Sequence, residues 1–137
     1  MTNKYMYFIA NWKMFGVLNS INSLHKVLKF FKTFKKNKSI KLIYCPPNTL
    51  LRPMTKKLKN SNIDVGAQNC HENESYGAFT GSVNSMMLKS VGAKYVIIGH
   101  SENRQIGETN KLINLKIKSA LRSGLKVIFC IGETLQH

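Results

Sequence analysis

The sequence predicts an α/β protein with a parallel β-sheet, and three observations support this. Five apolar runs of five or six residues recur along the 137 residues, and a segment with helical periodicity separates each run from the next. The runs are apolar throughout instead of alternating, which is typical of parallel strands buried on both faces. Polar side chains collect where the first and fourth runs end, and ligands bind at the carboxyl ends of such strands.

In the first half of the chain, strand Tyr7–Trp12 precedes a helix with an apolar stripe. A second strand, Lys41–Cys45, stops at a pair of prolines. Pro53 is placed in the first turn of the next helix, which runs to about Asn60, because proline suits that position. The stripe of the first helix comprises Val17, Ile21, Leu24, Leu28 and Phe31.

The second half continues the alternation. Two glycines in the loop Tyr76–Ser82 suit tight turning. The last helix is expected to bury one face, made of Ile113, Ile117, Ala120 and Leu121. The elements in order are strand Ile63–Ala67, a helix over about Val83–Ser90, strand Lys94–Gly99, a helix near Thr109–Ser123 and strand Lys126–Ile131.

Length and composition indicate one globular domain over residues 1–137, with 43% hydrophobic residues. The longest apolar stretches, around Tyr95–Ile98 and Val127–Ile131, are far shorter than the roughly 18–20 residues that span a bilayer. The first residues lack the pattern of a secretory signal. We therefore expect no membrane segment and a cytoplasmic location.

Cofactor and metal motifs are not found in the sequence. Cys45, Cys70 and Cys130 are odd in number and widely spaced, so we expect reduced, mostly buried thiols. The group Cys70-His71-Glu72 with Glu74 fits no standard metal-ligand spacing. Neither GxGxxG after the first strand nor GxxxxGK[ST] occurs. We expect no cofactor and no metal.

The net charge of +15 raises the question of nucleic-acid binding. Of the 21 basic residues only 3 are Arg, whereas readers of bases and phosphates favour the bidentate guanidinium. Lysines also fall on outward helix positions, namely Lys26, Lys29, Lys32 and Lys36. This pattern favours a solvated surface without a specific nucleic-acid partner. Non-specific attraction to polyanions at low salt is expected in either case.

The candidate functional side chains follow the ends of two predicted strands, the first and the fourth. Asn11 and Lys13 end the first strand two residues apart, so they should face one side while Trp12 faces the other. A neutral donor and a cation in one space suit an anionic or carbonyl-bearing small molecule. About ninety residues later, the fourth strand ends in an imidazole and a carboxylate, His100 and Glu102.

These segments resemble the triosephosphate isomerase family. The resemblance implies a (β/α)8 TIM barrel, of which this chain holds an N-terminal portion of five βα units, because about 27 residues per unit would require about 220 residues for eight. The matching motifs are Phe8–Gly16 for the first strand, Gly66–Cys70 for the third, Gly77–Gly81 for the interface loop, Ile98–Glu102 for the histidine segment and Cys130–Glu133 for the fifth strand.

The resemblance also implies the reaction, in which dihydroxyacetone phosphate and glyceraldehyde 3-phosphate interconvert through an enediolate. It makes His100, acting as a neutral imidazole beside a helix N-terminus, the electrophile. Lys13 would supply fixed positive charge, and Asn11 would bind and position the substrate. Ser101 would begin the supporting helix. Glu102 would either pair with Lys13 within about 4 Å or cap that helix.

The resemblance implies a homodimer, whose interface loop would include Phe79, Thr80 and Gly81. This chain has Ser82 where the family usually has Glu, and Asn103 where it has Arg. Those two charges would form a salt bridge across the interface. Losing both partners destabilises the interface less than losing one, because no charge is left unpaired. The dimer is therefore expected to be weaker or altered, unless both positions have simply drifted.

The resemblance places the general-base glutamate after a sixth strand and the phosphate-binding glycines after the seventh and eighth. We therefore expect the 137-residue chain alone to show isomerase activity no better than background. Three explanations stay open: an incomplete isomerase, one piece of a split enzyme, or a catalytically inactive half-barrel that acts as a basic binding module.

Overall fold

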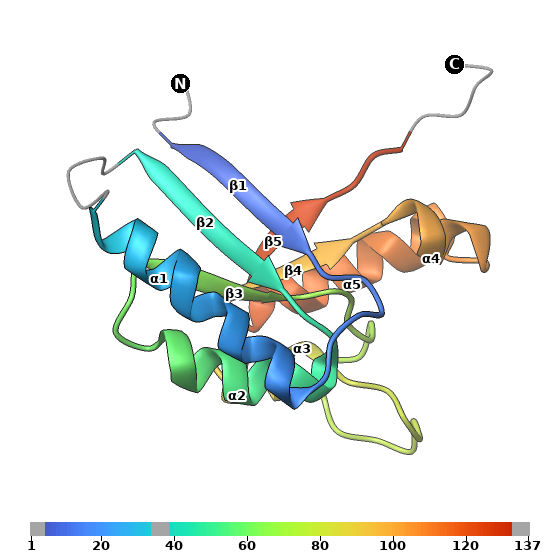
Figure 1. The fold of residues 1–137 in the computed structure, drawn as a ribbon. Helices are drawn as coiled ribbons and strands as arrows, with labels where there is room; N and C mark the ends of the chain where they lie inside the picture. Colours follow the sequence, from blue (N-terminus) through green and yellow to red (C-terminus); the bar gives the residue numbers. More distant parts are fainter. Residues whose placement is uncertain (1–4, 34–38, 133–137) are drawn as a thin grey trace.

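The protein is described here by a computed structural model, which covers residues 5–33 and 39–132, and its five strands form one parallel sheet (Figure 1). The strand order β1-β2-β3-β4-β5 follows the chain, so each strand pairs with its sequence neighbour. The predicted α/β class is confirmed. The strands are β1 (Met6–Asn11), β2 (Ile40–Cys45), β3 (Ile63–Ala67), β4 (Tyr95–Ile98) and β5 (Lys126–Phe129).

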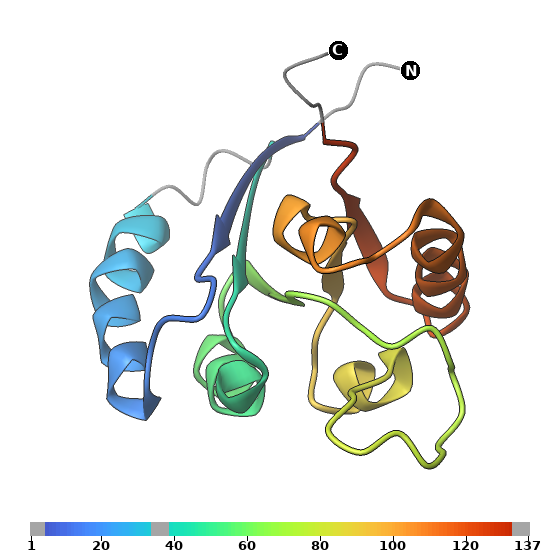
Figure 2. The same cartoon turned by 90° about the vertical axis from the view of Figure 1, so that its right-hand side faces the viewer.

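The helices cover one face of the curled sheet. Figures 1 and 2 show α1, α2, α3 and α5 outside the strands, while α4 follows the end of β4. None of the described helices is both long and apolar enough to cross a membrane. The helical elements are η1 (Leu18–Ser23), α1 (Leu24–Thr33), α2 (Asn48–Leu58), α3 (Ser85–Ser90), α4 (Ser101–Gln105) and α5 (Asn110–Arg122).

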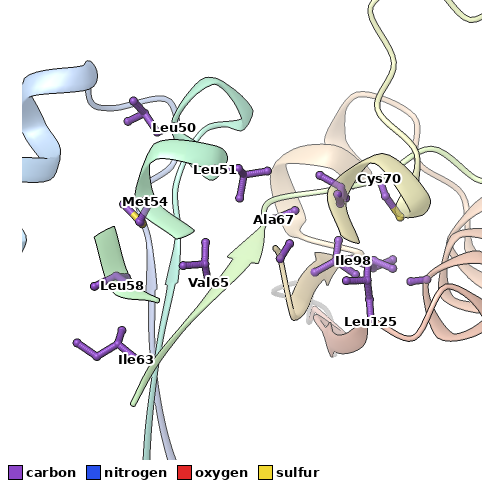
Figure 3. Packing of buried hydrophobic residues seen from close by; sticks show 14 of the residues in the cluster. Leu50, Leu51, Met54, Leu58, Ile63, Val65, Ala67, Cys70, Ile98 and Leu125 are labelled. Atoms are coloured by element: carbon purple, nitrogen blue, oxygen red, sulfur yellow. The ribbon is translucent and has the colours of Figure 1, made fainter. Parts of the chain in front are cut away.

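The main core lies between the helices and the outer face of the sheet (Figure 3). There Leu51 and Met54 of α2 pack in the same cluster as Val65 of β3. Truncating a fully buried side chain such as Met54 to Ala costs about 2–5 kcal/mol. A smaller cluster with Ile43 and Tyr95 lies on the inner face.

The first strand is buried on neither face. The side chains of Met6, Tyr7, Phe8 and Ile9 are 39–62% exposed, whereas all four residues of β4 are buried. The predicted burial on both faces is therefore correct for β4 and wrong for β1 and β5, neither of which has a buried residue. The reason is that β1 pairs with β2 alone among the described strands. An exposed apolar edge of this kind favours pairing with a further strand.

The second helix begins earlier than predicted. Pro53 lies well inside α2, since the helix starts at Asn48, and its placement in the first turn is wrong. The preceding Pro47 has φ −52° and ψ 151°, and its carbonyl accepts the Leu50 N–H at 2.9 Å, so the chain turns into the helix immediately after the prolines. Pro53 has no N–H and leaves one helical hydrogen bond unmade.

Two predicted core positions are exposed. Val17 precedes η1 and is 70% exposed, because the chain enters helical geometry only at Leu18 and the buried stripe starts at Ile21. Leu121 points outward from α5. The expected exposure of lysines on α1 is confirmed for Lys26, Lys29 and Lys32, and Lys36 lies outside the described residues.

The three cysteines are free thiols, as expected, with Cys45 and Cys70 buried and Cys130 half-buried. Burial raises the pKa of Cys45 to about 12 and that of Cys70 to about 11. Within residues 5–33 and 39–132, no three His, Cys, Asp or Glu side chains gather in a way that could hold a metal ion.

Candidate active site

The exit of β1 is a strained turn. Lys13 has φ +54°, which makes it the single non-glycine residue with positive φ in the described part of the chain. This conformation costs about 1–2 kcal/mol for an L-residue. The Lys13 N–H donates to Asn11 Oδ1 at 2.9 Å. Asn11 and Lys13 line one cleft while Trp12 packs on the outer core, as predicted, although this turn and not strand alternation places the lysine.

Gln68, directly after β3, contacts the same turn. Its Nε2 donates to the carbonyl of Lys13 at 2.7 Å and to that of Cys45 at 2.9 Å. The sequence reasoning assigned no role to this residue. A usable signal was present, because an amide follows β3 at the same edge of the sheet that carries Asn11 and His100.

The exit of β4 presents the imidazole. Gly99 has φ +77°, and a Cβ there would lie 2.9 Å from the Cys130 carbonyl oxygen, so glycine is required. His100 is the N-cap of α4, and its Nδ1 accepts the Glu102 N–H at 3.2 Å. The predicted helix start at Ser101, with a backbone amide facing the ring, is confirmed.

The two exits meet. Lys13 Nζ lies 2.8 Å from His100 Nε2 and 3.0 Å from Glu102 Oε1, which confirms the predicted ion pair. The hydrogen bond from Lys13 holds the pKa of the Glu102 carboxyl below its usual value. Glu102 also occupies the first turn of α4, so both predicted roles, ion pairing and favourable charge at a helix N-terminus, fit the geometry.

His100 has a donor beside each ring nitrogen: the Glu102 N–H lies 3.2 Å from Nδ1, and the Lys13 ammonium lies 2.8 Å from Nε2. A neutral imidazole accepts at one nitrogen only, so one of these two contacts is a hydrogen bond. When Nδ1 accepts the backbone N–H, Nε2 carries the ring hydrogen and is, like the Lys13 ammonium, a donor at one point of the rim. No atom fits between nitrogens 2.8 Å apart, but an oxygen atom on the cleft side of them would accept from both. Such an arrangement suits a carbonyl or oxyanion.

The cleft around this point has a volume of about 320 Å³. Asn69 lines this cleft, and its side chain forms hydrogen bonds with a buried ion pair. Its lining also includes Asn11, Lys13, Gln68, His100, Glu102 and Asn103.

The buried pair consists of Lys116 and Glu108, whose side chains are 11% and 4% exposed. Lys116 Nζ donates to Glu108 Oε1 at 2.5 Å and to Asn69 Oδ1 at 3.2 Å, and Asn69 Nδ2 donates to Glu108 Oε1 at 3.3 Å. The sequence reasoning missed this cluster. Its signal was a lysine on the apolar stripe of α5, between Ile113 and Ala120.

The loop predicted to form an interface projects from the sheet. The Phe79 ring packs against His71 with centroids 4.4 Å apart and the ring planes tilted by 40°, and Thr80 is exposed beside it. Gly81 has φ +82°, in keeping with the predicted tight turn. Ser82 donates its N–H to the Phe79 carbonyl at 3.0 Å. The interface role of this loop stays a prediction.

Arg104 joins the ends of β4 and β5. Its Nε donates to the Gly99 carbonyl at 2.7 Å and its Nη2 to the Cys130 carbonyl at 3.1 Å. Glu133, the last residue of the fifth-strand motif, lies outside the described residues.

Comparisons with known proteins agree with this geometry. A family profile described as triosephosphate isomerase matches residues 6–137. The triosephosphate isomerase of Carboxydothermus hydrogenoformans is 52% identical over 99 residues, covering 72% of this chain and 39% of that protein. That of Endomicrobium trichonymphae is 42% identical over 129 residues, covering 93% and 50%.

A solved structure gives the same result. The crystal structure of triosephosphate isomerase from Bartonella henselae matches with a TM-score of 0.86 and 37% identity, covering 95% of this chain and 53% of that one. The chain therefore spans about two fifths to half the length of these relatives. Its five strands correspond to an N-terminal portion of a TIM barrel, and the chain belongs to the triosephosphate isomerase family.

Proposed function

We propose that this chain provides the part of a triosephosphate isomerase that binds the triose phosphate and polarises its carbonyl group. The interconversion of dihydroxyacetone phosphate and glyceraldehyde 3-phosphate belongs to glycolysis and gluconeogenesis, and the expected compartment is the cytoplasm. The observation that carries the proposal is that Lys13 Nζ and His100 Nε2 lie 2.8 Å apart at the rim of the sheet and line one cleft.

Each residue has a role in this proposal. His100 donates from Nε2 to the substrate oxygen on which negative charge develops, and Lys13 stabilises that charge and the phosphate. Removing one such donor typically costs about 10²–10³-fold in rate. Asn11 positions the substrate, Glu102 holds the ammonium, and Ser101 begins the helix whose amide fixes the ring.

We assign the general base to none of the 137 residues, and its contribution is at least about 10²–10⁴-fold. We expect the purified 137-residue chain to show isomerase activity no better than background. Adding a polypeptide that carries strands six to eight of the Carboxydothermus hydrogenoformans relative should raise the activity. Robust turnover by the chain alone would contradict this assignment.

A binding experiment tests the site without relying on turnover. Dihydroxyacetone phosphate should shift the imidazole NMR signals of His100 and leave those of His25, an exposed histidine on α1, unchanged. The His100 shift should disappear in Lys13→Met. If the ligand leaves the His100 signals of the wild-type chain unchanged, the proposed function is wrong.

The proposal includes a homodimer that uses the loop with Phe79, Thr80 and Gly81. The exposure of Phe79 in this loop, and of Met14 next to the Lys13 turn, supports it. Neither Ser82 nor Asn103 carries a charge, so we expect weak association. Sedimentation of the wild type and of a Phe79→Ser variant checks this expectation, since only the variant should remain monomeric at high concentration.

A basic binding module is the second candidate. Its support is the net charge of +15 and two larger clefts, of about 450 and 410 Å³, which share no lining residue with the Lys13 cleft. They are lined by Lys32 and Lys57 in one case and by Arg52, Lys56, Lys59 and Lys94 in the other. A module of this kind would keep salt-sensitive binding to nucleic acid after Asn11, Lys13 and His100 are changed to Ala.

A further inference from the structure

Two side-chain amides hold the peptide groups of the strained Lys13 turn. The Lys13 N–H donates to Asn11 Oδ1 at 2.9 Å, and its carbonyl accepts from Gln68 Nε2 at 2.7 Å. Asn11 belongs to the same turn, whereas Gln68 follows β3, 55 residues later in the chain. Gln68 therefore attaches this turn to a different strand.

Both hydrogens of the Gln68 amide are used. The second goes to the Cys45 carbonyl at 2.9 Å, and this carbonyl also accepts the Trp12 N–H at 3.0 Å. Because both partners of Gln68 are carbonyl oxygens, only the NH₂ end of the amide fits there. One side chain thus joins the last residue of β2 to the turn that follows β1.

The position of the ammonium depends on that turn. Lys13 has a long, flexible side chain, and its Nζ reaches His100 and Glu102, which follow β4, from the far side of the cleft. The four-carbon stem delivers the charge to one place only if its backbone is fixed.

We propose that Gln68 is a positioning residue: its amide locks the left-handed Lys13 backbone and so aims the ammonium at the oxygen of the ligand. The identity of that ligand rests on the proposed function, but the placement of the ammonium does not. The two can therefore be tested separately.

The test titrates the Glu102 carboxyl by ¹³C NMR in the 137-residue chain. The hydrogen bond from Lys13 lowers the Glu102 pKa, so this pKa reports where the ammonium lies. Gln68→Met preserves the length of the side chain and removes both donors. We expect it to raise the Glu102 pKa to the value found in Lys13→Met. Gln68→Asn, which is too short to span both carbonyls, gives a second variant if Gln68→Met does not fold.

Asn84→Leu is the matched control. The Asn84 amide also donates to two backbone carbonyls, those of Glu74 and Ser75, at 2.7 and 3.2 Å, but it lies away from Lys13. Its loss should leave the Glu102 titration as in the wild type. An unchanged Glu102 pKa in the folded Gln68 variants, or an equal rise in Asn84→Leu, would overturn the positioning role.

Dihydroxyacetone phosphate is then added to the same chains. We expect Gln68→Met to bind it at least about tenfold more weakly than the wild type. If the Glu102 pKa rises in the Gln68 variants but the wild-type chain does not bind dihydroxyacetone phosphate, the positioning role stands and the proposed function fails. If Gln68→Met binds the ligand like the wild type with an unchanged Glu102 pKa, the function stands and the positioning role fails.

Discussion

Two lysine–glutamate pairs in this molecule share a chemistry and differ in their surroundings. Lys116 and Glu108 meet inside the protein, with side chains 11% and 4% exposed. Lys13 and Glu102 meet at the rim of the sheet, with side chains 38% and 64% exposed. The inner pair is enclosed by the fold, whereas the rim pair lines a cleft that is open to a ligand.

The difference shows what each pair can do. A buried pair contributes rigidity, because breaking it leaves a charge without water or partner. An accessible pair contributes little to stability, since solvent screens it, but it keeps a charge in one position. Asn69 connects the two regions, because it bonds to the buried pair and lines the cleft.

The largest expected effect comes from breaking the inner pair. Lys116→Met should lower the free energy of unfolding by about 3–5 kcal/mol, because the Glu108 charge remains buried without its counter-charge. Urea denaturation measures this loss. The double variant Lys116→Met/Glu108→Leu should recover most of it, since apolar replacement of both partners strands no charge. Equal losses in the single and double variants would show that packing, not charge, holds this region.

A smaller effect is expected at the rim, where backbone geometry matters more than charge. Gly99→Ala should cost about 2–4 kcal/mol, because the new methyl group meets the Cys130 carbonyl at a positive φ. Gly107→Ala is the control: Gly107 also has positive φ, but a Cβ there meets nothing within 4 Å. It should cost only the strain, about 1–2 kcal/mol. Similar midpoints in urea for both variants would contradict the close approach at Gly99.

The smallest effect is expected from the rim pair itself. The folded-state pKa of Glu102 is lowered, so its contribution to stability is present above the ordinary pKa of a carboxyl group and is lost as the pH falls through the lowered value. Urea midpoints of the wild type and Glu102→Gln, measured from pH 7 to pH 3, should differ slightly at neutral pH and coincide in acid. A neutral-pH loss as large as that of Lys116→Met would remove the distinction between the two pairs.

The strands could be predicted from the sequence because they depend on local patterns. The third strand has the bounds that its apolar run indicates, Ile63–Ala67. The approach of the first and fourth strand exits followed from their common edge in a parallel sheet, whereas the pairing of Lys13 with Glu102 was implied by the family resemblance.

Other features depend on contacts between distant segments, which no local pattern contains. The Lys13 turn with its positive φ accepts a hydrogen bond from Gln68, which follows β3, and the burial of Glu108 depends on where α5 places Lys116. The early start of α2 was misjudged because Pro53 was treated as a helix start, although Pro47 already performs that function.

The strand order also bears on how this protein is made. Since β1 to β5 pair in the sequence in which a ribosome delivers them, every new strand has its partner waiting as it emerges. The first strand, like β5, has a second edge that pairs with none of the described strands, and β1 is the strand that emerges first. During translation, therefore, the apolar side chains of Met6 and Phe8 remain accessible longest, and a chaperone that binds extended apolar segments would find its target there.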